Sequence, residues 1–354
     1  MAAASEPQIV VNDSHSKDVH NKDIQIDDIE SFFAPTSKKD NDKVNKKREK
    51  IVVNIINNSI PDYYFKIPKW SHLKRNIHHF LSSLCEEKGI TLSEETSIVC
   101  RIKGGRKTNY DFEIIINHVH IFKIEWKYGA EKVIQTPQFY SPCKPSKYLP
   151  QTMPFEEWYY DNYLDNIVKH PASQQRERPN KQEYIKTINN NEVPCMSYYS
   201  ELYKKNNDFK DHCKKEDKKA IRLYIQHTYG GLDFMKLSQR LIESQNDKIY
   251  MLCKNGNIKM EKVNPELYQL TDVISTTNTD YICGTKTGMK VRIKLRFKNG
   301  CGLKFPAFQI DRLIPKVKEL KALCDNHQPT PLDYRKRVKK DELIEILDNA
   351  GVIY

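Results

Sequence analysis

The chain lacks any apolar run of about 18 residues, the length that a helix needs to cross a membrane. Its N-terminus has neither the basic region nor the apolar core of a secretory signal. The nine cysteines are scattered and never form C-x-x-C, which argues against a disulfide framework and a zinc knuckle. These absences predict an intracellular protein in a reducing compartment, with no membrane partner.

Several common catalytic motifs are missing as well. The eleven histidines form no H-E-x-x-H or paired metal spacing, and there is no G-x-S-x-G. The Gly104-Gly105 pair lacks the Lys-Ser/Thr that follows in a P-loop. The chemistry, if there is any, must therefore come from another set of residues.

What the sequence has in excess is positive charge. The 354 residues carry a net charge of +12, which favours a polyanion such as nucleic acid over a neutral small substrate. Residues 1–50 contain nine basic and ten acidic residues, no glycine and one aromatic pair, which predicts a disordered tail. The tail therefore has a net charge of −1, and residues 51–354 carry +13.

The pattern after residue 50 alternates between helical and strand periods. Apolar residues at helical spacing predict a helix over Ser71–Lys88. A strand is expected at Ser97–Lys103, and two-residue alternation in Tyr110–Asn117 and Val119–Tyr128 predicts a hairpin. Further elements are expected along the rest of the chain: helices at Pro154–His170, Lys181–Asn189, Tyr198–Tyr229, Asp233–Glu243 and Lys339–Asn349, a hairpin around Asn255-Gly256, and strands within Asp280–Ile310, including Lys290–Lys298.

The hairpin carries three charged residues of interest. Asp111 opens its first strand, and Glu125 and Lys127 point to one face of the second, because strand side chains alternate. Hydrolysis of a phosphodiester requires an acidic pair that can hold Mg²⁺ and a cation that offsets the developing charge. The alternative is that these three charges simply form the solvated face of a half-buried sheet.

This order of helix, strand and hairpin, with Asp111 and Glu125-x-Lys127, resembles the PD-(D/E)XK nuclease superfamily. Tyr110 stands where the superfamily often has Pro. The resemblance implies Mg²⁺ as cofactor, with Mn²⁺ as a substitute. It also implies a polar residue after the E-x-K strand, for which Gln138 is the candidate, and a supporting Glu on the first helix. Helical spacing from Leu73 favours Glu87 over Glu86 for that role.

The expected fold is α/β (α+β), with a restriction-endonuclease-like core of a mixed central sheet flanked by helices and a C-terminal helical plus β-hairpin region. The core is assigned to residues 51–170, and a basic region for target binding to 171–354. The predicted function is a Mg²⁺-dependent endonuclease acting on double-stranded DNA, similar to type II restriction enzymes, and a homodimer is left open. The alternatives are a structure-selective repair or recombination nuclease and a non-catalytic DNA-binding accessory protein.

Residues 26–35 of the tail resemble the PIP box, which docks on the replication sliding clamp. Ile29, Phe32 and Phe33 have the spacing of one helical face, although Ile26 stands where the motif usually has Gln. The alternatives are that this segment binds another partner, or that the aromatic pair docks on the protein's own domain. Basic runs at 38–39 and 46–48 resemble a bipartite nuclear import signal, and the alternative is a plain solvated linker. We expect the protein in the nucleus or at a site of DNA replication, either cellular or viral.

Two basic stretches are candidates for DNA contact. One lies within the expected helix over Tyr198–Tyr229 and the other on the strand Lys290–Lys298, where alternate side chains share a face. The alternative is an ordinary solvated helix. The predicted DNA-binding residues are Lys214, Lys215, Lys218, Arg222, Arg292 and Lys294.

Overall fold

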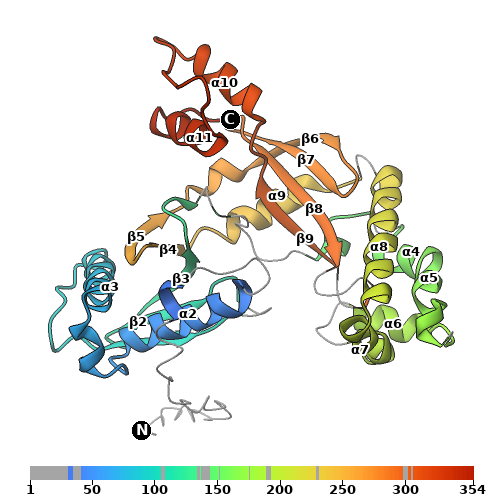
Figure 1. Ribbon diagram of the computed structural model, residues 1–354, viewed down its shortest axis with the longest axis horizontal. Helices are drawn as coiled ribbons and strands as arrows, with labels where there is room; N and C mark the ends of the chain where they lie inside the picture. Colours follow the sequence, from blue (N-terminus) through green and yellow to red (C-terminus); the bar gives the residue numbers. More distant parts are fainter. Residues whose placement is uncertain are drawn as a thin grey trace, which may run out of the picture.

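A computed structural model gives the arrangement of the chain (Figure 1). The residues that it describes are 31–34, 41–104, 108–133, 136, 144–150, 152–174, 176–188, 193–228, 231–297, 302–303 and 306–354. Within these ranges the protein is a mixed α/β structure with ten α-helices, one five-stranded mixed sheet and one four-stranded antiparallel sheet. None of the helices in the described ranges is long and apolar enough to span a membrane.

The five-stranded sheet has the order β1-β2-β3-β4-β5. Its strands are β1 (Ile98–Ile102), β2 (Phe112–Ile116), β3 (His120–Tyr128), β4 (Lys248–Lys254) and β5 (Asn257–Lys262). Neighbouring strands are antiparallel except for β3 and β4, which run parallel. One core contains apolar side chains from one face of this sheet together with those of α2 (Asn41–Ile56) and α3 (Pro68–Glu86). The predicted helix, first strand and hairpin are thus confirmed, with Pro68 rather than Ser71 beginning the helix.

A helical region is inserted between β3 and β4. Its helices are α4 (Phe155–Asn162), α5 (Leu164–Val168), α6 (Lys181–Ile188), α7 (Ser197–Lys205), α8 (Asn207–Thr228) and α9 (Phe234–Glu243). The helix expected over Pro154–His170 is divided at Tyr163, which has a non-helical backbone. The helix expected over Tyr198–Tyr229 is divided at Asn206, whose side chain accepts the Phe209 N–H at 2.8 Å and caps α8.

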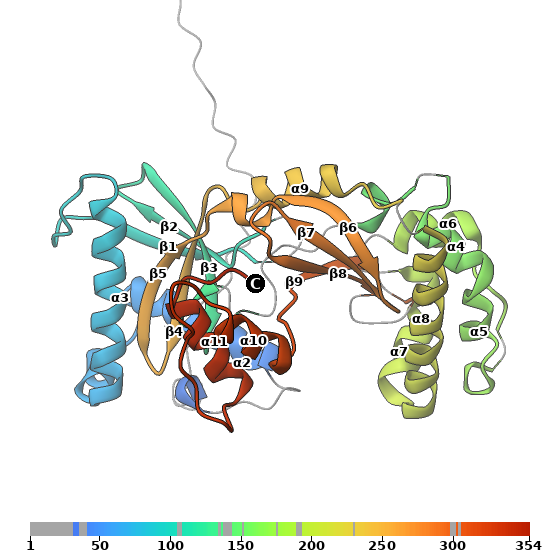
Figure 2. The same cartoon turned by 90° about the horizontal axis from the view of Figure 1, so that it is seen from above.

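The second sheet and a pair of helices complete the chain. The sheet has the order β6 (Leu270–Thr276), β7 (Asp280–Thr285), β8 (Lys290–Phe297) and β9 (Pro306–Arg312). It packs on the inserted helices, with the Phe297 ring 5.3 Å from that of Phe155 and 4.7 Å from that of Tyr159. Helices α10 (Val317–Asp325) and α11 (Lys340–Asn349) share a small core of their own. Figure 2 shows α3 and α8 at opposite ends of the molecule with the sheets between them.

Short 3-10 helices join these elements. They are η1 (Ser31–Phe33), η2 (Asp62–Lys66), η4 (Pro145–Lys147), η5 (Pro171–Ser173), η6 (Pro194–Met196) and η7 (Pro265–Tyr268).

Both expected domain boundaries differ from the structure. The boundary at residue 50 falls inside α2, because the buried face of that helix continues upstream from Ile55 through Ile51 to Arg48. Arg48 is buried and its guanidinium lies 3.5 Å from the centre of the Tyr128 ring, so this part of the basic run is not a free linker. The core expected at 51–170 also lacks β4 and β5, which complete the sheet from the other side of the helical insertion.

Candidate active site

Asp111 is held against the E-x-K strand by the register of the hairpin. Its backbone N–H donates to the carbonyl of Ile124 at 2.9 Å, so it stands directly before the first ladder pair of β2 and β3. Its side-chain Oδ2 accepts the backbone N–H of Trp126 at 2.8 Å. Trp126 lies between Glu125 and Lys127 and points to the opposite, buried face. The Asp111 carboxylate is thereby fixed beside both charged residues of the motif.

Two lysines hold the carboxylate of Glu125. Lys127 Nζ donates to Oε1 at 2.5 Å, and Lys248 Nζ, from the first residue of β4, donates to Oε2 at 3.2 Å. The side chain of Lys248 is only 1% exposed, compared with 22% for that of Lys127. The site is therefore a partly buried cluster in which Glu125 is oriented from two sides.

The electrostatic consequences follow from burial and mutual proximity. Burial, and then the neighbouring Glu125, raise the pKa of Asp111 to about 6. Burial would lower the pKa of Lys127, but the Glu125 and Asp111 carboxylates raise it above the ordinary value. Lys127 is therefore a protonated donor in this structure and not a free base.

Glu49 of α2 is a site residue that the sequence analysis missed. Burial, and then the charge of Asp111, raise the pKa of Glu49 to about 7, while Lys46 and Lys127 act in the opposite direction. Its carboxyl therefore belongs to the electrostatic surroundings of the cluster. The sequence shows the helical spacing of Ile51 and Ile55, but the charged residues before them conceal the continuation of the helix to Glu49.

Lys248 was also missed. Burial lowers its pKa, and the Glu125 carboxylate partly offsets that effect. It reaches the site because β4 pairs in parallel with β3, which brings Lys248 opposite Lys123 in the register. No local pattern in the sequence indicates this pairing.

The donor set fits a magnesium ion bound largely by water and substrate. Among the described residues, no group of three or more His, Cys, Asp or Glu side chains is arranged to hold a metal ion. Mg²⁺ in enzymes that act on phosphates is often held by only one or two carboxylates together with waters and phosphate oxygens. Asp111 and Glu125 supply such a pair, and a cation would offset both burial and the neighbouring Glu125 carboxylate, which together raise the pKa of Asp111.

Of the other two predicted members of the site, Glu87 lies among the described residues and is not joined to this cluster. Glu87, expected as the supporting carboxylate, forms an ion pair at 2.7 Å with Lys262 of β5 instead. It follows the last residue of α3 and faces the edge strand, because α3 packs against β5. Glu87 is therefore not the supporting carboxylate of the cluster, and Gln138 lies outside the described residues.

The aromatic pair of the predicted clamp-binding motif packs into the protein's own core. The Phe32 ring is fully buried, with its centre 5.7 Å from that of Trp70 and 5.8 Å from that of Tyr128. Phe33 is partly buried, and Ile29 lies outside the described residues. Arg48 donates to the carbonyls of Phe32 at 2.8 Å and of Ala34 at 2.7 Å. This arrangement matches the alternative in which the pair docks on its own domain.

The predicted DNA-binding residues divide into two groups. Lys218 and Arg222 of α8 and Lys294 of β8 line one common groove. The remaining three do not line it: Arg292 donates to Asp311 through Nη2 at 2.5 Å and Nε at 3.3 Å, Lys214 pairs with Asp211 at 2.9 Å, and Lys215 is exposed on α8.

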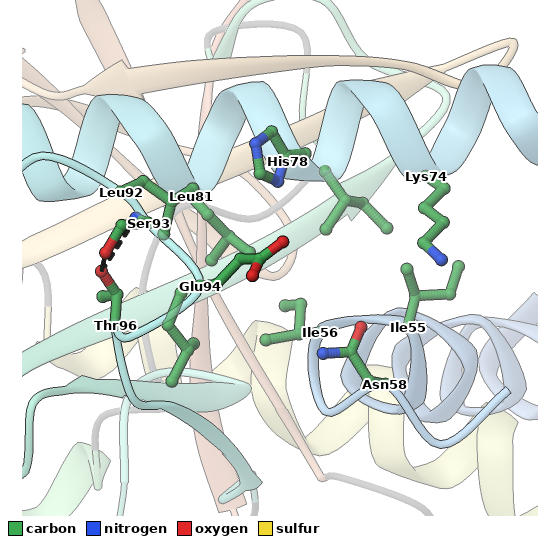
Figure 3. A pocket seen from close by; sticks show the side chains of 12 residues that line it. Ile55, Ile56, Asn58, Lys74, His78, Leu81, Leu92, Ser93, Glu94 and Thr96 are labelled. Carbon is green, nitrogen blue, oxygen red and sulfur yellow. Dashed lines mark hydrogen bonds between the residues drawn. The ribbon is translucent and has the colours of Figure 1, made fainter.

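A separate pocket of about 410 Å³ lies between α2, α3 and the segment before β1 (Figure 3). Half of its lining residues are apolar, and Lys74, His78 and Glu94 contribute the charged or titratable groups. It contains none of the predicted catalytic residues, so the pocket and the charged cluster are distinct places in the fold.

No protein-family model matches the chain, and no curated protein or solved structure matches it either.

Proposed function

We propose that the protein is a Mg²⁺-dependent endonuclease that hydrolyses phosphodiester bonds of double-stranded DNA at the cluster of Asp111, Glu125 and Lys127. One observation carries the proposal: the Trp126 N–H holds Asp111 beside Glu125, whose carboxylate bonds Lys127. A solvated sheet face does not require this arrangement, because exposed charges there would point into water. The PD-(D/E)XK resemblance of the hairpin supports the same reading.

Each side chain has a role in this proposal. Asp111 and Glu125 would hold the ion, which when bound polarises the scissile phosphate and lowers the pKa of a water. Lys127 is protonated and donates toward charge that develops on the phosphate. A carboxyl with a pKa of about 7 can accept a proton from an attacking water near neutral pH, and Glu49 supplies that group. Lys248 is a positioning residue that fixes the second oxygen of Glu125.

The test compares Asp111→Asn with a matched variant two residues further along the chain, in β2. Glu113→Gln likewise removes one carboxylate, but Glu113 is held by Lys103 and Tyr110 and not by the cluster. Plasmid DNA and branched oligonucleotides are incubated with Mg²⁺ and each full-length protein. We expect cleavage to be lost in Asp111→Asn and retained in Glu113→Gln.

The products separate the alternatives. Discrete bands from intact duplex support the proposal, whereas cutting confined to branches would favour a repair nuclease. Binding without cutting by the wild-type protein would leave an accessory DNA-binding protein. Wild-type cleavage rates in Asp111→Asn would refute the assignment of the site.

A further inference from the structure

A groove between α8 and the second sheet joins the two basic stretches of the sequence. The cavity has a volume of about 600 Å³. One wall is the second half of α8, where Lys218 and Arg222 are four residues apart and so lie on one helical face. The opposite wall is β8 with Lys294 and Arg296, whose side chains share one face of the sheet. Figures 1 and 2 both show the end of this sheet beside α8.

The cations of this groove differ from several lysines of the helical region that are neutralised by ion pairs. Lys169, Lys181 and Lys204 form ion pairs with nearby carboxylates at 2.7, 2.8 and 2.5 Å. Within the described ranges, neither Lys218, Lys219, Arg222 nor Lys294 pairs with an acidic side chain. The charge of these four side chains is therefore not taken up by ion pairs among the described residues.

The lining indicates an extended anion rather than a small organic molecule. Its five cations stand against one carboxylate, that of Asp217, which is buried. Asn278 and Thr279, from the turn before β7, add neutral polar groups at the rim. A row of separate cations along an open groove suits a ligand whose negative charges repeat along its length, as phosphates do in duplex DNA.

We propose that the groove between α8 and β8 binds the phosphate backbone of duplex DNA, with Lys218, Arg222 and Lys294 as its principal contacts. The site is built by the helical insertion and the second sheet, not by the sheet that carries the catalytic cluster. The inference rests on the proposed function, since it takes DNA to be the substrate. It deepens that proposal by giving the substrate a second area of contact with a defined set of residues.

The test measures binding of a short duplex by fluorescence anisotropy without divalent cations, so that cleavage plays no part. The groove variant is Lys218→Gln/Arg222→Gln/Lys294→Gln in the full chain. The matched control, Lys169→Gln/Lys181→Gln/Lys204→Gln, removes the same charge from paired surface positions. Titration between about 50 and 200 mM NaCl should show the slope of log K against log salt reduced by about 2.7 in the groove variant, at about 0.9 for each phosphate that the protein no longer neutralises. In the control the slope should fall by less than about 0.9.

Unchanged slopes in the groove variant, or equal reductions in both variants, would overturn the groove as a binding site. Tighter binding of a matched RNA duplex would overturn its assignment to DNA. An unchanged urea midpoint is required of both triple variants, since all six side chains lie at the surface or in the groove. Failure of the proposed function has a different signature: no Mg²⁺-dependent cleavage by the wild-type protein, with the slope difference intact.

Discussion

Replacing Phe32 by Ala should destabilise the protein as a core mutation does. The ring is 0% exposed and contacts Trp70, Trp126 and Tyr128, so truncation removes a fully buried aromatic side chain. Such substitutions lower the free energy of unfolding by about 3–5 kcal/mol. Because the short η1 segment can relax into part of the cavity, we expect the lower end of this range, about 3 kcal/mol. That is a large fraction of the roughly 5–15 kcal/mol stability of a typical protein.

The measurement is urea unfolding followed by tryptophan fluorescence. Trp158 packs in the other core, so a Trp158→Phe background restricts the signal to Trp70 and Trp126, the neighbours of Phe32. Phe33→Ala is the matched control, because Phe33 is only partly buried and its loss should cost about 1 kcal/mol. A Phe32→Ala midpoint equal to that of the wild type would refute the burial of this segment.

The same free energy bears on clamp binding, which stays a proposal. A clamp can bind Phe32 only after the ring has left the core. The apparent affinity is therefore the intrinsic affinity multiplied by the fraction of molecules in which the ring is released. With about 3 kcal/mol of docking energy, the full chain should bind a sliding clamp about 100-fold more weakly than a peptide of residues 20–40 does. Calorimetry of both against one clamp measures the ratio, and equal affinities would contradict intramolecular docking.

Three further predictions concern the site. Burial, and then Asp111, raise the pKa of Glu49 to about 7, so the folded protein retains a proton that the unfolded chain has released. The free energy of unfolding without metal should therefore fall as pH rises from about 5 to about 8. Glu49→Gln should flatten that pH profile, as measured by thermal unfolding. Lys248→Met should leave Glu125 held from one side only. Single-turnover cleavage should then fall about 10–100-fold, as it does when a group that orients a metal ligand is lost. Lys248→Arg should recover part of the cleavage rate. A protein truncated to residues 51–354 should not cleave DNA, because it lacks Glu49 and Phe32; activity of that fragment in the plasmid assay would contradict both the proposed role of Glu49 and the importance of the segment.

The sequence predicted the parts of the site that depend on local geometry. Two-residue alternation is a property of each strand, so it placed Glu125 and Lys127 on one face and Trp126 on the other. The hairpin turn then fixed the register that brings Asp111 beside them.

Other features of the site and the fold could not be predicted from the sequence. They arise from strand pairing between distant parts of the chain, or they lie in segments whose composition suggests a different structure. Lys248 joins the site through a parallel strand, and nothing near it in the sequence marks that strand as a neighbour of β3. Glu49 was missed because its helix begins with a polar, highly charged turn that resembles the tail before it, and Arg48 occupies a position in its buried stripe. The division of α7 from α8 rests on the single cap at Asn206, which a continuous basic pattern conceals.

The helical insertion between β3 and β4 has a consequence for synthesis of the protein. Glu125 and Lys248 are 123 residues apart in the chain, yet they share a hydrogen bond. On the ribosome, the hairpin with Asp111, Glu125 and Lys127 emerges well before the strand that completes the sheet beside it. Non-local parallel pairing of this kind forms late in folding, so Glu125 lacks its second lysine during that interval. A nascent chain would therefore carry the three motif residues without the finished cluster, and any cleavage activity should begin only after β4 has been released and paired.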